Sequence, residues 1–371
     1  MKYPKETVGT DILQKGEKIM GDLTPIRVGM AGFGMSGRLF HAPFLHADPR
    51  FSLRRVYERT SERAREEYPA AEVVHSFEAL LTEDVDLIVI TTPNPLHVPM
   101  AEAALRRGKH VVVEKPLAAS FKEAEALCCL AREQGVLLTV YQNRRLDGGF
   151  LTVRKLIEGG RLGEVVDYTC HFDRFITGYR SKPWKREGGR GVDLLYDIGV
   201  HLVDQAVSLF GLPGEVYGDL RRQRPESPGV DRFTVVLYYP DKRAVLSAGE
   251  LVAMPGPHLA VNGRKGTYLK YGRDVQEERL LRGLRPAEDP EWGREDPADF
   301  GKLYTVTEDG VREEAVPTET GDYGGYYDAL YQTLRHGAPP LVGPGEAAAV
   351  LRILEAAQES SREKRRVPLD R

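Results

Sequence analysis

"IRVGMAGFGMSG" (residues 26–37) is the stretch that decides the fold of this chain. It joins a short apolar run to Gly32, Gly34 and Gly37, which have the spacing G-x-G-x-x-G, and a helical pattern follows. A strand, a glycine turn and a helix in this order form the context in which the motif binds a dinucleotide. The first glycine allows the tight turn, the second lets the backbone approach a pyrophosphate, and the third lets helix and strand pack closely.

All six residues of the glycine turn are therefore candidate cofactor contacts: Gly32, Phe33, Gly34, Met35, Ser36 and Gly37. The motif also needs an acidic residue about 20 positions further on, where a second strand ends. Glu58 ends the strand-like run "FSLRRVYE" and stands there. Its carboxylate would accept hydrogen bonds from the adenosine ribose and repel a 2′-phosphate, which favours NAD. The neighbouring Arg59 could instead pair with a 2′-phosphate or stack on adenine, which leaves NADP open.

The composition excludes several other classes of protein. A chain of 371 residues predicts about two domains. With 52 basic and 55 acidic residues, it has no general attraction for nucleic acid or an anionic membrane. No apolar run approaches the ~20 residues of a membrane span, and the first 25 residues show no signal-peptide pattern. Cys128, Cys129 and Cys170 form neither a disulfide framework nor a spaced metal site. We expect a cytoplasmic protein with no metal, nucleic-acid or membrane partner.

The first half of the chain alternates apolar strands with helices. Four further strand-like segments are 51–58, 85–92, 110–116 and 136–143, and two helical segments are 97–108 and 120–135. Continuously apolar strands between helices are typical of a doubly wound parallel sheet, so residues 26–143 are expected to form a Rossmann domain. Residues 1–25 are expected to be an N-terminal extension, with Met20 as the hypothetical natural start.

The character of the sequence changes in residues 144–371. Strand-like segments now follow one another with fewer helices: 165–172, 231–240 and 243–252. This pattern predicts an α+β domain with a large, mostly antiparallel open sheet. "FTVVLYY" (233–239) is apolar on both faces, so a second subunit is expected to cover one face in a homodimer or homotetramer. We expect residues 274–300 to be a surface excursion and 345–366 to be a terminal helix.

The stretch "YDIGVHLVDQAVSLFG" (196–211) places Asp197 and His201 one helical turn apart. They would share a face of a helix that is otherwise apolar. Taken alone, Asp197 could be an N-terminal cap and His201 a buried core histidine. The alternative is a pair of catalytic groups, and this segment by itself favours neither.

Four stretches together resemble the glucose–fructose oxidoreductase/inositol dehydrogenase (Gfo/Idh/MocA) family: "GFGMSG" (32–37), "TTPNPLH" (91–97), "EKP" (114–116) and "YDIGVH" (196–201). The resemblance runs from about residue 26 to the C-terminus. "YQNRR" (141–145) and "YLKYG" (268–272) look most like scyllo-inositol dehydrogenases of that family.

The resemblance implies roles for particular residues. Lys115 would lie beside the nicotinamide, before a Lys–Pro bond that is commonly cis in the family, and Asp197 and His201 would complete the catalytic set. Further cofactor contacts would come from Thr92, Pro93, Asn94, His97, Glu114, Asn143 and Trp184. Substrate contacts would come from Arg144, Arg174 and Tyr196, in addition to Lys115, Asp197 and His201.

Elementary chemistry agrees with these roles. Ligands of open α/β sheets bind at the carboxyl ends of the strands, which is where Lys115 is predicted. Oxidation of a secondary alcohol needs a base, and histidine suits this role near neutral pH. Asp197 would orient the His201 ring, and Lys115 would stabilise the developing alkoxide. The sequence thus predicts an NAD(P)-dependent dehydrogenase of a cyclic polyol or sugar, such as scyllo- or myo-inositol.

Three departures from the family pattern bear on specificity. Asp193 stands where a small residue is expected, Leu146 where inositol-type members have an aromatic residue, and Glu58 where strict NADP users have a small or basic one. Arg144, Arg145 and Arg174 leave an anionic sugar open. Two other functions also stay open: an enzyme that oxidises a sugar only transiently, and a nucleotide sensor without catalysis.

Overall fold

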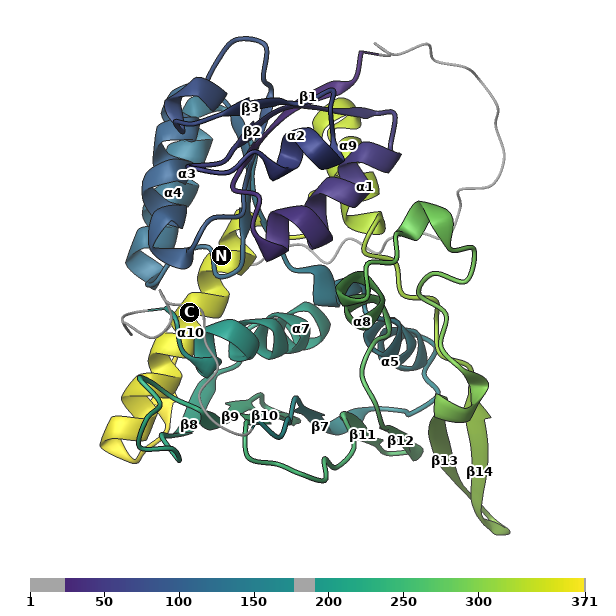
Figure 1. The fold of residues 1–371 in the computed structure, drawn as a ribbon. Coiled ribbons are helices and arrows are strands. Elements are labelled where there is room, and N and C mark those ends of the chain that lie inside the picture. Colours follow the sequence, from purple (N-terminus) through teal and green to yellow (C-terminus); the bar gives the residue numbers. More distant parts are fainter. Residues whose placement is uncertain (1–23, 177–190, 370–371) are drawn as a thin grey trace.

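The computed structural model describes residues 24–176 and 191–369. It contains two sheets, one above the other in Figure 1, with helices between and around them. The predicted division between residues 143 and 144 falls just after the last strand of the first sheet, which ends at Tyr141.

The first sheet has six strands, all parallel. In spatial order they are β3 (Glu72–Val74), β2 (Phe51–Tyr57), β1 (Ile26–Ala31), β4 (Leu87–Ile90), β5 (His110–Glu114) and β6 (Leu138–Tyr141). The strand order reverses between β1 and β4, so the crevice at their carboxyl ends is where ligands of such sheets bind. The predicted doubly wound fold is confirmed. Only β3 was missed, because three residues carry too little periodicity to predict a strand.

Helices cover both faces of this sheet (Figure 1). One face packs on α3 (His97–Arg106) and α4 (Phe121–Gln134), and the other on α1 (Ala42–Ala47), α2 (Arg63–Glu67) and α9 (Gly325–His336). Alternate residues of β1 belong to different buried clusters: Val28 and Met30 to one and Ala31 to the other. Helix α9 comes from the far end of the chain, yet its Tyr326 and Tyr327 lie in the same cluster as Val28.

The second sheet has nine strands and is antiparallel except for one parallel pair, β7 with β10. In spatial order they are β14 (Gly310–Val316), β13 (Gly301–Thr307), β12 (Gly266–Lys270), β11 (Leu259–Gly263), β7 (Val165–His171), β10 (Arg243–Gly249), β9 (Arg232–Tyr238), β8 (Glu215–Arg221) and β15 (Val367–Pro368). The predicted mostly antiparallel sheet is confirmed.

Helices α5 (Gly148–Glu158), α7 (Val200–Phe210) and α8 (Gln276–Leu281) lie between the second sheet and the first domain in Figure 1, and α10 (Pro344–Glu363) lies at their side. Helix α10 runs alongside both domains and packs on α4, α7 and β8. Strand β9 alternates buried residues, such as Val235, with half-exposed ones, such as Val236, which face away from these helices. Among the described residues, no helix is long and apolar enough to cross a membrane.

The expectation that residues 274–300 form only a surface excursion is wrong. Gln276 and Leu280 of α8 are buried, and so is Trp292, whose ring nitrogen donates to Gln276 Oε1 over 3.1 Å. The segment therefore contributes to the core, although nearly half of its residues are charged. Its few apolar residues are spaced too irregularly to show a helical or strand period.

A buried ion pair fixes the turn that leads from the first domain into the second. Arg145, in the helical turn η4 (Asn143–Leu146), donates two 2.7 Å hydrogen bonds to Asp204 of α7. It also donates to the carbonyl of Leu341, just before α10, over 2.6 Å. A bidentate pair of this kind is strongly directional, so it sets the register of η4 against α7. The end of β6 is thereby held beside His201.

Candidate active site

The glycine turn after β1 has the geometry that a dinucleotide requires. Gly32 has a φ of +105°, which favours glycine, and a Cβ on Gly37 would lie 2.5 Å from the carbonyl oxygen of Gly32. A Cβ on Gly34 would have no atom within 4 Å, so this backbone is open to a ligand. The helical turn η1 (Gly37–His41) begins at once, and its N-terminus suits an anion. The residues present thus fit a pyrophosphate.

The other residues of the turn divide into two groups. Met35 is about half exposed and available to a ligand, whereas the Phe33 ring is buried edge-on against Tyr68. The Ser36 hydroxyl donates to Glu114 Oε1, so the turn is bonded to the residue before Lys115. Phe33 and Ser36 are therefore placed to act on a cofactor mainly through their backbone.

Glu114 connects the glycine turn with Lys115. Its Oε1 also lies 3.0 Å from His41 Nε2, and its Oε2 accepts a 3.0 Å hydrogen bond from the backbone N–H of Lys115. Burial would raise the pKa of Glu114, but the hydrogen bond and charge of His41, together with Lys115 and Ser36, lower it to about 2. The carboxylate is thus ionised, and it holds the backbone of Lys115 rather than facing open solvent.

The end of β2 differs from the expectation for NAD. The carboxylate of Glu58 is buried and accepts hydrogen bonds from Ser61 Oγ (2.6 Å) and from the backbone N–H of Ala64 (2.9 Å). These bonds bind it within its own loop at the start of α2. Arg59 and Arg63, in contrast, are exposed. This edge of the sheet presents guanidinium groups, so Glu58 does not by itself favour NAD over NADP.

The turn after β4 holds four further candidate residues. Thr92, Pro93 and Asn94 are partly exposed, and Asn94 donates to the carbonyl of Gly191 over 2.6 Å. His97 is buried, with Nδ1 2.8 Å from the Pro116 carbonyl and Nε2 2.9 Å from the Thr92 carbonyl. Both ring nitrogens thus face backbone carbonyls, so His97 lies between this turn and Pro116. Its expected place along the nicotinamide ribose stays a prediction. The sequence placed it at the start of a helix but could not show that it points inward.

Lys115 and Asp197 meet across the two domains. The Lys115–Pro116 bond is cis, as the family resemblance implied. Lys115 Nζ donates to Asp197 Oδ1 over 2.8 Å and to the Asp197 carbonyl over 2.9 Å. Asp197 lies in η5 (Leu195–Gly199), a π-helical turn that continues directly into α7. Such turns are frequent at functional sites.

His201 lies on α7 and is 3% exposed. Its Nδ1 is 2.9 Å from Oε1 of Gln142, which directly follows β6. An amide oxygen accepts, so Nδ1 carries the proton and Nε2 keeps its lone pair. The expected orienting residue was Asp197, but its carboxylate is turned toward Lys115 and Gln142 fixes the ring. Gln142 was not predicted as a site residue, although it lies within "YQNRR" (141–145) and at the carboxyl end of a strand.

The charge state of His201 follows from its surroundings. Burial, followed by the positive charges of Lys115 and Arg144, lowers the pKa of His201 well below its ordinary value, while the charge of Asp197 acts in the opposite direction. The imidazole is therefore neutral at neutral pH. A neutral ring with a free Nε2 can take a proton from an alcohol.

Three of the remaining predicted site residues, Asn143, Arg144 and Tyr196, are buried. Asn143 and Arg144 are buried at the start of η4, and the Arg144 guanidinium donates to Glu277. The Tyr196 ring is buried, and its hydroxyl donates to the Ala119 carbonyl over 3.3 Å. Its expected contact with a substrate stays a prediction. Trp184 lies outside the described residues.

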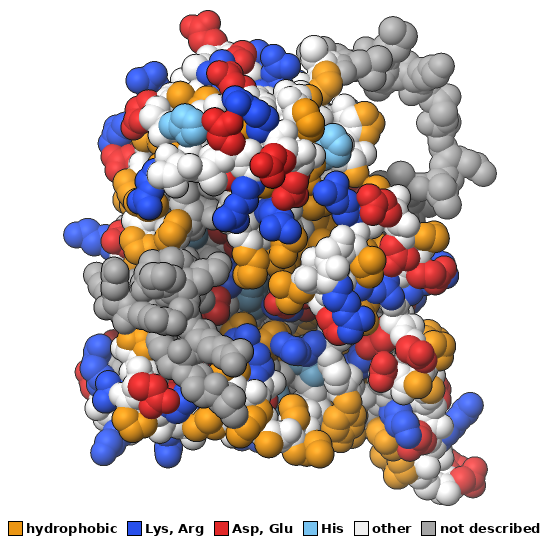
Figure 2. All heavy atoms as spheres, viewed as in Figure 1, with side chains coloured by type: hydrophobic (Ala, Val, Ile, Leu, Met, Phe, Trp, Pro, Cys, Tyr) orange, Lys and Arg blue, Asp and Glu red, His pale blue; other side chains and the backbone are white. Residues whose placement is uncertain are grey.

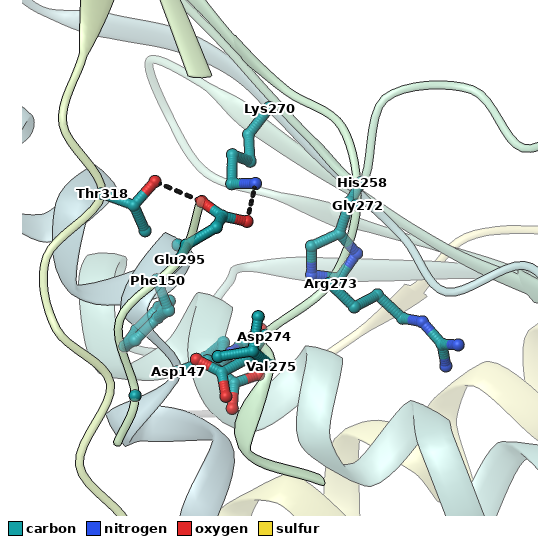
Figure 3. Close-up of a pocket in the computed structure, with 13 residues that line it drawn as sticks. Asp147, Phe150, His258, Lys270, Gly272, Arg273, Asp274, Val275, Glu295 and Thr318 are labelled. Carbon is teal, nitrogen blue, oxygen red and sulfur yellow. Dashed lines mark hydrogen bonds and ion pairs between the residues drawn. The ribbon is translucent and has the colours of Figure 1, made fainter. Parts of the chain in front are cut away.

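Figure 2 shows that the surface is hollowed between the two domains, with Lys and Arg side chains around the hollow. Figure 3 shows a small cavity lined by residues of the second domain. There Lys270 Nζ and Thr318 Oγ1 each donate to Glu295 over 2.6 Å. Within the described part of the chain, no three His, Cys, Asp or Glu side chains are grouped to hold a metal ion.

Two family models match this chain and together cover most of it. Residues 26–142 match the NAD-binding Rossmann fold of the oxidoreductase family GFO_IDH_MocA, and residues 154–369 match its C-terminal alpha/beta domain. The chain belongs to the Gfo/Idh/MocA oxidoreductase family. The resemblance read from the sequence motifs is thereby confirmed.

Curated relatives within the family are similar along nearly their whole length. The chain is 38% identical over 346 residues to scyllo-inositol 2-dehydrogenase (NADP(+)) IolW of Bacillus subtilis, covering 93% of this chain and 96% of that protein. It is 39% identical over 339 residues to the oxidoreductase YdgJ of Escherichia coli, covering 91% and 96%. The solved structure of yvaA from Bacillus subtilis has a TM-score of 0.91 at 37% identity, covering 94% of this chain and 99% of that one.

Replacing Gln142 by Glu tests the state assigned to His201. A carboxylate 2.9 Å from Nδ1 favours the imidazolium and should raise the pKa of His201 by roughly 1–3 units. Because the base is active only when neutral, the acidic limb of kcat/KM for alcohol oxidation should move to higher pH. The pH dependence of kcat/KM measures this shift, and Gln142→Met, which adds no charge, is the control. An acidic limb that moves equally in both variants, or in neither, would contradict the assignment.

Proposed function

We propose that this chain is an NADP-dependent dehydrogenase that transfers a hydride between the nicotinamide and a secondary alcohol of a cyclic polyol or sugar, of the scyllo- or myo-inositol type. The observation that carries the proposal is the meeting of Lys115, Asp197 and a neutral His201 at the carboxyl ends of β5 and β6. The open glycine turn lies at the same edge of the sheet, which is where a nicotinamide cofactor would place its reactive ring.

Lys115, His201 and Asp197 have different tasks in this proposal. Lys115 Nζ has three N–H donors, of which Asp197 accepts two, and the third donates to the reacting oxygen of the substrate. His201 Nε2 takes the hydroxyl proton, and the Lys115 charge stabilises the developing alkoxide. Asp197 holds Lys115 in place and moderates the positive charge near His201. The cofactor, when bound, supplies the hydride acceptor.

The first test is turnover. Lys115→Ala and His201→Ala should each lower kcat by about 10²–10⁴-fold, since each removes a group that acts in the transition state, while nucleotide binding persists. Absorbance of the reduced nicotinamide reports turnover with scyllo-inositol, myo-inositol and a panel of aldoses, and calorimetry reports binding. Lys122→Ala, an exposed lysine of α4, is the matched control.

Near-wild-type turnover in either active-site variant would contradict its assignment. If the wild-type chain binds the nucleotide but oxidises nothing in the panel, transient oxidation of a sugar or nucleotide sensing becomes the better account.

The choice of NADP rests on the end of β2. The Glu58 carboxylate is bonded within its own loop, whereas the exposed Arg59 can pair with a 2′-phosphate. The similarity to an NADP(+)-dependent relative supports the same choice. Arg59→Ala should weaken NADP binding about tenfold or more and change NAD binding little, as measured by the Kd of each nucleotide. Equal losses for both nucleotides would show that Arg59 contacts another part of the cofactor.

We also propose that the chain forms a homodimer or homotetramer through the second sheet. The helices of that domain lie on one face, and half-exposed residues of β9 such as Thr234, Val236 and Tyr238 line the other. A sheet face of this kind is commonly buried against another copy. Light scattering should give a mass of two or four chains, which Val236→Lys should reduce. A wild-type mass of 41.4 kDa would contradict this proposal.

A further inference from the structure

Three arginines surround the buried ring of Phe172, at the end of β7. The guanidinium carbons of Arg144 and Arg273 lie 4.7 Å from the ring centroid, and that of Arg174 lies 5.5 Å from it. They come from three separate parts of the chain: η4, the segment after β7, and the segment after β12. Three cations at one ring repel one another, so the arrangement calls for negative charge nearby.

Only one of the three is paired in the structure. Arg144 donates to Glu277 and lies 3.4 Å from Asp147. Across the described part of the chain, no carboxylate lies within 4.0 Å of the Arg174 or Arg273 guanidinium, and neither donates a side-chain hydrogen bond. The Nε atoms of Arg144 and Arg174 are buried without a partner. Figure 3 shows the Arg273 guanidinium directed away from the Lys270–Glu295 pair and from Asp147 and Asp274.

The nearby carboxyl groups do not neutralise this arginine cluster (Arg144, Arg174 and Arg273). Burial and the neighbouring Asp274 raise the pKa of Asp147 to about 8, so that group is mostly protonated at neutral pH. Burial would raise the pKa of Glu277, but Arg144 lowers it, and this group stays ionised. Two carboxylates, Glu277 and Glu278, therefore act on three guanidinium groups. Burial and the charges of Arg144 and Arg174 lower the pKa of Arg273, whereas the charge of Glu277 acts in the opposite direction.

The arginine cluster adjoins the proposed catalytic group. Gln142 contacts His201, and two residues later the Arg144 carbonyl accepts a 2.8 Å hydrogen bond from Gln205, one turn further along α7. The charge of Lys115 also contributes to lowering the pKa of Glu277. The cluster thus lies near His201, within the second domain. The glycine turn that fits the cofactor phosphates belongs to the first domain.

We propose that Arg174 and Arg273, supported by Arg144, bind an anionic substituent of the substrate. The substrate would then be a sugar acid or a polyol or sugar phosphate, with its carboxylate or phosphate held away from the alcohol that reacts. Planar guanidinium groups with unused donors match both anions. This inference rests on the proposed function for the hydride chemistry but is tested through binding alone.

The experiment is calorimetry on the full chain saturated with NADP, so that the cofactor site is occupied. The probes are myo-inositol 1-phosphate against myo-inositol, and D-glucuronate against D-glucose. At least one anionic probe should bind about tenfold or more tightly than its neutral counterpart, because each charge-assisted hydrogen bond is worth about a factor of ten. The preferred pair distinguishes a phosphate from a carboxylate.

The double variant Arg174→Gln/Arg273→Gln should abolish this advantage of the anionic probe over its neutral counterpart. Arg273→Gln alone changes an exposed side chain and should remove part of the advantage if the double variant does not fold. Arg221→Gln, at an exposed arginine paired with Asp219, is the control and should keep the advantage. The inference is overturned if neither anionic probe binds more tightly than its counterpart, or if the advantage survives in the arginine variants.

Lys115→Ala separates this inference from the proposed function. The variant should retain the preference for the anionic probe while losing turnover. If the wild-type chain shows the binding preference but oxidises none of the probes, the anion site stands and the proposed hydride chemistry fails. If it oxidises neutral polyols with no anionic preference, the proposed hydride chemistry stands and the anion site fails.

Discussion

The hydrogen-bonded ion pair between Lys115 and Asp197 joins the two domains at the edge of the parallel sheet. Without this pair, the Lys115 side chain after its buried strand would extend into solvent, and the Asp197 side chain in its π-helical turn would also face solvent. Glu114 fixes the backbone of Lys115 from the cofactor side, and the Arg145–Asp204 pair fixes α7 from the other. The geometry of the site therefore depends on both domains being present and correctly registered.

Two buried groups in and beside the site, His201 and Asp147, are mostly uncharged at neutral pH, and they shape the chemistry. Burial, together with the charge of Lys115, keeps His201 uncharged, so Nε2 is available as a base, and Gln142 determines which ring nitrogen carries the proton. Further into the second domain, Asp147 is mostly protonated and leaves the arginine cluster without sufficient negative charge. We infer that substrate orientation is set by an anion at one end and by Lys115 at the other, which would present a single hydroxyl for oxidation.

The sequence predicted the fold well because its signals are local. The glycine spacing and the apolar strands identify a Rossmann domain without any distant contact, and the family motifs singled out Lys115. What it missed depends on packing between segments far apart in the chain. Gln142 lies within the motif "YQNRR" (141–145), but its role depends on the packing of η4 on α7. His97 matched a motif, but its inward direction follows from Pro116. Arg273 became a candidate only when its neighbours at Phe172 were known.

We propose the Lys115 and His201 group as the site of hydride transfer, and a crystal structure of the chain with NADPH would test this. The account predicts that the nicotinamide ring lies at the carboxyl ends of β5 and β6. Its C4 should leave room for a substrate carbon roughly 3–3.5 Å away that also contacts Lys115 Nζ and His201 Nε2. A nicotinamide turned away from both residues, with the pyrophosphate correctly seated on Gly34, would contradict it.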